Sequence, residues 1–152
     1  MAGNAFTKRI QEEIKTAMKA KDELRLGTLR MLLSELKGAQ IDEGELSEER
    51  EIAILSTSAR RRKESIREYE NAGREDLAAQ ERAELEIVMA YLPAQMDEAA
   101  VEAELVKIIA ETGAAGPSDM GRVMGAMMGR HKGAVDGNVV KNIAMRLLRG
   151  GN

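Results

Sequence analysis

The stretch DELRLGTLRMLLSELKGAQIDEG, residues 22–44, has a regular helical pattern of apolar residues. A leucine stripe of helical period runs through it, formed by Leu26, Leu29, Leu33 and Leu36. Asp22 precedes the stripe, and its carboxylate can accept a hydrogen bond from a free N–H group of the first helical turn. The stretch therefore predicts a long amphipathic helix that frays near Asp42–Gly44.

The segments on either side predict further helices of similar kind. Apolar residues at helical spacing indicate a first helix over residues 4–20. Ser47, followed by acidic residues in a first turn, starts a third helix that runs to about residue 71. A fourth helix runs from about Asp76 to Leu92, where Pro93 ends it. Residues 1–95 should thus form an N-terminal domain of antiparallel helices.

Three shorter helices are expected in residues 96–152, which should form a separate C-terminal domain. Asp97 can cap the first of them, and the segment from Gly113 to Pro117 breaks it. Ser118 can cap the next helix, over residues 119–128. After the turn at Asp136-Gly137, a last helix continues to about residue 149.

The composition favours an all-α protein and excludes several kinds of chemistry. The 152 residues are 43% hydrophobic but only 2% aromatic, and Ala, Leu, Met, Glu and Arg dominate. Without cysteine there are no disulfides or thiolate sites, and His131, the single histidine, has no local partners for a catalytic triad. We therefore expect no enzyme activity, no metal and no cofactor. With no apolar leader and no run that could span a bilayer, a cytoplasmic protein without membrane contact is expected.

The C-terminal segment is basic although the whole chain has a formal net charge of −3. From Pro117 to Asn152 there are six Lys/Arg and two Asp/Glu, a local charge of +4. Six basic residues and two neighbours in one loop are therefore candidate RNA-binding residues: Arg122, Arg130, His131, Lys132, Gly133, Lys141, Arg146 and Arg149. The alternative is an ordinary solvated helix face whose cations favour the C-terminal end of the dipole.

A second basic cluster lies in the third helix, in SARRRKESIREYE (58–70). Arg60, Lys63 and Arg67 share one face at i, i+3 and i+7. Arg62 falls instead in the apolar stripe, so either its stem covers the core edge or that edge is a second binding surface. The alternative for this face is solvated side chains with Arg60 paired to Glu64.

Glycine recurs at every fourth position of MGRVMGAMMGRHKGAVDG, residues 120–137. We expect Gly121 and Gly125 to allow close packing of a neighbouring helix, whereas Gly129, Gly133 and Gly137 serve turns. Approach of bare amides to a phosphate is the alternative. No aromatic residue follows Tyr91, so RNA contacts in the tail would address phosphate and shape rather than unstacked bases.

Several motifs resemble the YqeY family, in order and over nearly the whole chain. They are LRMLLSELKGAQID (29–42), RRRKESIREYENAGREDLAAQERAEL (60–85), YLPAQM (91–96) and DMGRVMGAMMGRHKGAVDGNVVKNIAMRLL (119–148). The family pattern falls here on Met120, Gly121, Val123, Met124, Gly125, Lys132, Gly133, Asp136 and Gly137. Gly129 stands where many relatives have proline, and Arg122 replaces the more usual lysine.

The resemblance implies two different α-helical domains and kinship with the tail of the B subunit of the tRNA-dependent amidotransferase. That tail is understood as a tRNA-contacting module, so carbon–nitrogen ligase activity belongs to a catalytic body with no counterpart here. The expected function is non-catalytic binding of tRNA or structured RNA, with no binding of DNA. The protein would be accessory to tRNA aminoacylation or amidation, and an enzyme of either reaction is an expected partner. The alternative is a helical adaptor that binds a protein through its Met-rich face.

Overall fold

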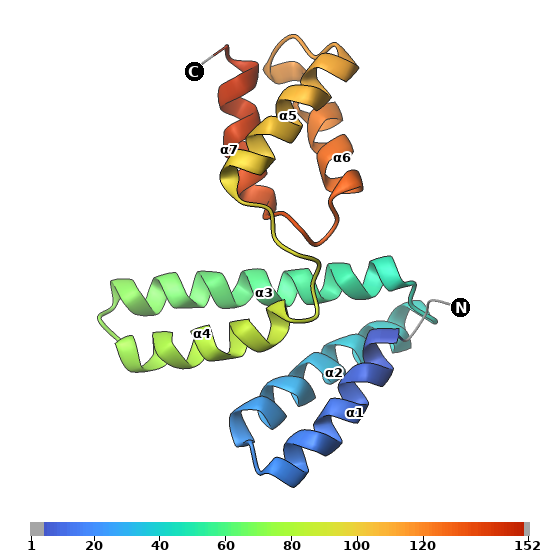
Figure 1. Cartoon of the computed structure of the whole chain (residues 1–152), viewed down its shortest axis with the longest axis vertical. Helices are drawn as coiled ribbons and strands as arrows, with labels where there is room; N and C mark the ends of the chain where they lie inside the picture. Colours follow the sequence, from blue (N-terminus) through green and yellow to red (C-terminus); the bar gives the residue numbers. More distant parts are fainter. Residues whose placement is uncertain (1–4, 151–152) are drawn as a thin grey trace. The chain divides into compact units, whose positions relative to one another are not determined.

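The computed structural model of the protein describes residues 5–150, which contain seven α-helices, one short 3-10 helix and no strand (Figure 1). This confirms the all-α prediction. The chain divides into two compact units, the first ending at Leu92 and the second beginning at Pro93. The helices are α1 Ala5–Ala20, α2 Glu23–Glu43, α3 Glu48–Asn71, α4 Glu75–Met89, α5 Glu98–Thr112, η1 Pro117–Asp119, α6 Met120–Arg130 and α7 Gly137–Leu148.

Side-chain caps start four of these helices. Three of them, at Asp22, Ser47 and Asp97, confirm predicted caps, whereas the sequence predicted only a turn at Asp136. Asp22, Ser47 and Asp97 each accept a hydrogen bond from the backbone N–H three residues later, and Asp136 accepts from that of Asn138. These bonds satisfy N–H groups that have no partner within the helix.

The predicted cap at Ser118 is wrong. Pro117 starts the 3-10 turn, a position where its fixed φ and missing N–H are tolerated, so Ser118 lies inside that turn. Asp119 occupies the N-cap position of α6, but its carboxylate accepts instead from the backbone N–H of Ala115 at 2.8 Å. The acidic side chain thus closes the loop before α6 rather than capping the helix.

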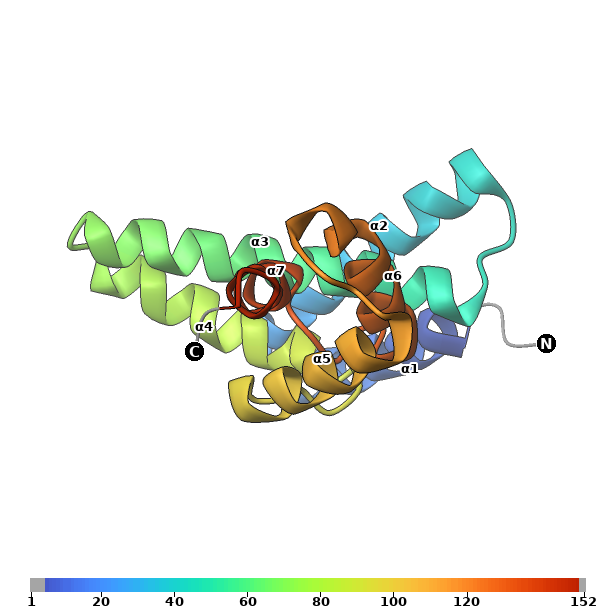
Figure 2. The same cartoon turned by 90° about the horizontal axis from the view of Figure 1, so that it is seen from above.

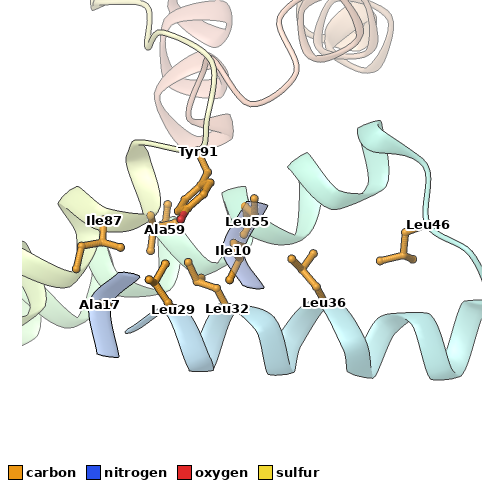
Figure 3. Packing of buried hydrophobic residues seen from close by; sticks show 11 residues of the cluster. Ile10, Ala17, Leu29, Leu32, Leu36, Leu46, Leu55, Ala59, Ile87 and Tyr91 are labelled. Atoms are coloured by element: carbon orange, nitrogen blue, oxygen red, sulfur yellow. The ribbon is translucent and has the colours of Figure 1, made fainter. Parts of the chain in front are cut away.

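The first unit packs the hairpin of α1 and α2 against the hairpin of α3 and α4. Leu29, Leu32 and Leu36 are fully buried and point from α2 toward side chains of the other three helices (Figure 3). The core as a whole comprises Ile10, Ala17, Leu29, Leu32, Leu36, Leu46, Leu55, Ala59, Ile87, Val88 and Tyr91. Removing these apolar side chains from water is the main force that holds the four helices together.

The second unit is a three-helix arrangement of α5, α6 and α7 (Figure 2, where α7 is seen nearly end-on). Each helix contributes one apolar edge to a separate core. The buried residues are Val101, Leu105, Ile108, Val123, Met127, Val140, Ile143, Ala144 and Leu148. Met120, Met124 and Met128 pack partly buried against this core, so the methionines of α6 belong to the interior of the unit.

The predicted close packing at Gly121 and Gly125 is wrong. Both residues are exposed, and a Cβ atom added at either would meet no atom within 4 Å. The buried edge of α6 is centred on Val123 and Met127, and about 100° per residue places Gly125 on the opposite side. Gly129, expected in a turn, lies inside α6 and is equally open.

Candidate nucleic-acid interface

Arg130 ends α6 and is held by two carboxylates of α5. Its Nη2 lies 2.5 Å from Oε2 of Glu111, and its Nη1 lies 3.4 Å from Oε1 of Glu104. The hydrogen bond that Arg130 donates to the Glu111 carboxylate raises the pKa of Arg130 above its ordinary value. Arg130 is therefore at the surface, but its charge is already compensated within the unit.

His131 follows directly and approaches the same carboxylate. Its Nε2 lies 3.6 Å from Oε1 of Glu104, with the side chain 27% exposed, and its backbone N–H donates to the carbonyl of Met127 at 3.1 Å. Burial acts to raise the pKa of Glu104, but His131 and Arg130 together hold it below its ordinary value. Glu104 of α5 thus contacts both Arg130 and His131, the first residues of the predicted basic loop.

The loop itself has a defined shape that depends on Gly133. Its φ of +74° lies in the left-handed region, where a side chain is unfavourable. The carbonyl of Gly133 accepts a hydrogen bond of 2.6 Å from the Gln95 amide, and the backbone N–H of Met96 donates to the carbonyl of Ala134 at 2.9 Å. The segment before α5 therefore fixes the loop and leaves Lys132 exposed.

The outer face of α7 has two kinds of cation. Arg146 forms an ion pair with Glu102 of α5, whereas Lys141 and Arg149 are exposed and have no ion pair within residues 5–150. Arg122, on α6, pairs with Asp119 at 2.6 Å and donates to the carbonyl of Thr112. Of these four residues, only Lys141 and Arg149 carry charge that no neighbour balances.

The basic character predicted for the tail does not extend to the whole unit. The count of +4 for residues 117–152 omits α5, whose acidic residues lie against the basic ones in space. From Pro93 to Asn152 there are seven Lys/Arg and seven Asp/Glu, so the formal charge of the unit is zero. A local sequence window cannot reveal this, because the pairing residues lie 19 to 44 positions apart.

The second basic cluster is less compensated. Arg60 and Arg67 are exposed and Lys63 is half-buried, and none of the three has an ion pair within the described part of the chain. The pair between Arg60 and Glu64 that the sequence allowed is not formed there. Three cations on one face of α3 are therefore free to contact an anionic partner.

Arg62 does not belong to that surface. It is 5% exposed, with Nε 3.5 Å from Oε1 of Glu84 and Nη1 2.5 Å from the Ser58 hydroxyl. Its place in the apolar stripe of α3 carries it inward, where Glu84 balances its charge. The expectation that Arg62 could bind a partner at the surface is wrong.

A buried carboxylate in the first unit has no clear sequence signal. Glu51 looks like an ordinary first-turn acid of α3, yet its Oε2 accepts from the backbone N–H and the hydroxyl of Thr7, at 3.1 and 3.0 Å. It thereby satisfies a free N–H in the first turn of α1, so its role is structural.

Two further findings bear on the chemistry of residues 5–150. They contain no group of three or more His, Cys, Asp or Glu side chains placed to hold a metal ion. None of their helices combines the length and apolar character needed to cross a membrane.

The protein belongs to the class of all-α proteins and consists of two small helical units. Its described part has cations at the surface and no cluster of metal ligands. Residues 7–148 match the family described as Yqey-like protein, and the chain belongs to that family. This confirms the resemblance seen in the sequence motifs.

Curated relatives in fungi carry the name "Altered inheritance of mitochondria protein 41, mitochondrial". The protein of Pyrenophora tritici-repentis is 31% identical over 90% of this chain and 77% of its own length. Those of Vanderwaltozyma polyspora and Lachancea thermotolerans are 38% and 36% identical over 55% and 72% of this chain. These two alignments span 46% and 60% of the relatives' own lengths. The relatives' mitochondrial names contradict the expected cytoplasmic location.

Proposed function

We propose that the protein binds tRNA or another structured RNA without catalysing a reaction, through phosphate contacts made by its uncompensated surface cations. The observation that carries this proposal is the distribution of those cations. Arg60, Lys63 and Arg67 lie on one face of α3, whereas Lys141 lies on α7 and Arg149 directly follows that helix as its C-cap. Most of the other predicted tail cations are already paired with carboxylates.

Helix geometry suits these faces to a phosphate backbone. Arg60 and Arg67 are seven residues apart, about 10 Å along α3. Lys141 lies in the second turn of α7 and Arg149 at its C-terminal end, about 12 Å further along the helix axis. Cations spaced in this way can each neutralise a different phosphate and release its counterions.

The same proposal includes an accessory role beside an enzyme of aminoacylation or amidation, because the resemblance implies such a setting. The alternative of an adaptor that uses the Met-rich face is not supported. Met127 is fully buried, and the three neighbouring methionines of α6 pack against the core of the second unit.

Charge reversal at the two faces tests the proposal with bulk tRNA as the probe, by fluorescence anisotropy at several salt concentrations. We expect Arg60→Glu/Lys63→Glu/Arg67→Glu and Lys141→Glu/Arg149→Glu each to weaken binding. The slope of log affinity against log salt should flatten by about 0.7–0.9 for each lost phosphate contact.

The control is Lys15→Glu/Lys19→Glu, which reverses two charges on the exposed side of α1, as Lys141→Glu/Arg149→Glu does at α7; Lys15 pairs there with Glu12 at 3.5 Å. It should bind nearly as the parent does. If both charge-reversed variants are folded by circular dichroism and bind tRNA with the parent's affinity and salt slope, RNA binding through these faces is disproved.

A further inference from the structure

Helix α2 has apolar residues on two sides. The inner side builds the core, and the outer side is largely exposed, with the sulfur of Met31 lying 3.9 Å from Nη2 of Arg62. Its inner side supplies the core leucines and packs on α1, α3 and α4. Its outer side exposes Leu24, Met31 and Ile41, which are 40%, 50% and 84% exposed. A surface helix of a small unit normally presents charged and polar residues there.

The centre of the outer side is formed by residues with small or no side chains. Gly27, Ser34 and Gly38 are exposed between the three apolar side chains, and a Cβ at either glycine would meet no atom within 4 Å. Each glycine lowers the intrinsic stability of the helix, and nothing in the first unit needs the space. A second helix could therefore approach closely along this line.

Charge marks one edge of this surface. Arg30 and Lys37 are exposed, seven residues apart, and have no ion pair within the described chain. On the opposite edge Glu35 is already engaged, with Oε1 3.7 Å from Nη1 of Arg61. Glu23 and Asp42 complete the charges and lie at the two ends of the helix. The middle of the surface is therefore apolar with a positive border.

We infer that the outer face of α2 is a docking surface for an amphipathic helix of another protein, whose apolar stripe is bordered by acidic residues. Leu24 and Ile41 are 17 residues apart, so the surface is about 25 Å long and fits a partner helix of similar length. Apolar contacts would supply affinity, and acids facing Arg30 and Lys37 would set orientation.

The charges argue against a second copy of this chain as the occupant. In an antiparallel two-fold pair of α2 helices the same edge of each copy meets, so Arg30 and Lys37 would face like charges. In a parallel pair they would face Glu35, whose carboxylate is already paired with Arg61. This inference does not depend on RNA binding, which involves other helices.

The test uses two designed 20-residue helical peptides with the same Leu/Ala stripe. One carries Glu along the border of the stripe and the other carries Lys at the same positions. Binding of each labelled peptide to the full chain is followed by fluorescence anisotropy. We expect the Glu-bordered peptide to bind at least about tenfold more tightly than the Lys-bordered one.

Two variants and one control then locate the site. Arg30→Glu/Lys37→Glu should reverse the preference between the peptides, whereas Lys15→Glu/Lys19→Glu should leave it unchanged. Met31→Ser/Ile41→Ser removes apolar contacts without changing charge and should weaken the Glu-bordered peptide by about tenfold or more. These positions are exposed, so circular dichroism should show parental helicity for each variant.

Three results would overturn the inference. The first is equal binding of both peptides, or no binding of either. The second is a preference that Arg30→Glu/Lys37→Glu does not change. The third is a dimer of the chain, seen by analytical ultracentrifugation, that Met31→Ser/Ile41→Ser dissociates, because a second copy would then be the occupant.

Discussion

The Tyr91 hydroxyl donates a hydrogen bond of 2.5 Å to Oε1 of Glu13, and so ties the segment after α4 to α1. Oε2 of the same carboxylate lies 3.0 Å from Nη2 of Arg25. The guanidinium of Arg9 lies 4.5 Å from the centroid of the tyrosine ring. Burial, and then the bond to Glu13, raise the pKa of Tyr91 above its ordinary value. The first unit is thus closed by a polar cluster at the edge of its core.

Removing the hydroxyl should weaken this closure. Tyr91→Phe keeps the buried ring but leaves Glu13 without its neutral donor, so we expect a loss of about 1–2 kcal/mol in the free energy of unfolding. Urea denaturation followed by circular dichroism measures this change. Tyr69→Phe is the control, because the Tyr69 hydroxyl has no hydrogen bond among residues 5–150. Equal stability of the two variants would mean that the bond contributes nothing.

Most of the fold follows from local sequence, whereas this cluster does not. Helix ends depend on interactions within one helical turn, so a short stretch of sequence contains both the capping residue and its partner. This holds for the caps at Asp22, Ser47 and Asp97 and for the helix end before Pro93. Tyr91 and Glu13 are 78 positions apart, and no spacing rule connects them. Periodicity predicts that a helix has a buried side but does not name the residue that it meets.

The buried pair of Arg62 and Glu84 gives a larger expected effect. The Glu84 side chain is 12% exposed, and Arg62→Met removes the cation that pairs with it. We therefore expect the free energy of unfolding, measured in urea, to fall by about 3–5 kcal/mol. Arg62→Met/Glu84→Met removes both charges and should recover part of that loss. A double variant whose loss equals the sum of the two single losses would show that the pair is not coupled.

Helix α6 should become more stable when its exposed glycines are replaced. Gly125→Ala adds a methyl group that meets no atom within 4 Å, so we expect a gain of about 0.5–1 kcal/mol from helix propensity. Gly113→Ala is the contrast, because Gly113 caps α5 with φ of +70° and should lose stability. Thermal unfolding compares the two. Destabilisation by Gly125→Ala would point to a neighbour that lies against this face.

Acid should weaken the second unit through Asp119 and Glu104. The pKa of Asp119 is lowered first by the Ala115 amide and then by Arg122, and that of Glu104 is also lowered. A lowered native pKa gives stability that is present above the unfolded values of 3.8 and 4.5 and is lost as pH falls through the native values. Asp119→Asn/Glu104→Gln should therefore flatten the loss below about pH 4.5. An unchanged acid profile would contradict this.

The candidate site was harder to predict than the fold because charge depends on neighbours. The sequence identifies Arg130 and Arg146 as cations but not the α5 carboxylates that balance them, since α5 lies outside the basic segment. The burial of Arg62 was also hard to predict, because its position in an apolar stripe indicates a buried side chain while its charge indicates an exposed one. Which of the two prevails is decided by Glu84, a residue of another helix.

If α7 contacts RNA, freeing its paired arginine should strengthen binding. Glu102→Gln removes the charge that holds Arg146 and turns a compensated cation into one that can reach a phosphate. We expect tRNA affinity to rise by up to about fivefold, with a steeper salt slope, because an exposed ion pair is weak and little is lost by breaking it. Anisotropy titrations with bulk tRNA measure both quantities.

Glu98→Gln is the matched control for that experiment. It makes the same change of charge on the same helix, and Glu98 lines the same surface pocket as Arg146 but has no ion pair within the described residues. Glu98→Gln therefore changes the charge near Arg146 without breaking an ion pair. Long-range attraction alone would raise affinity equally in both variants. A larger rise for Glu102→Gln would place Arg146 in contact with RNA, whereas equal effects would exclude Arg146 from the contact surface and leave Lys141 and Arg149 as the residues of α7 to test.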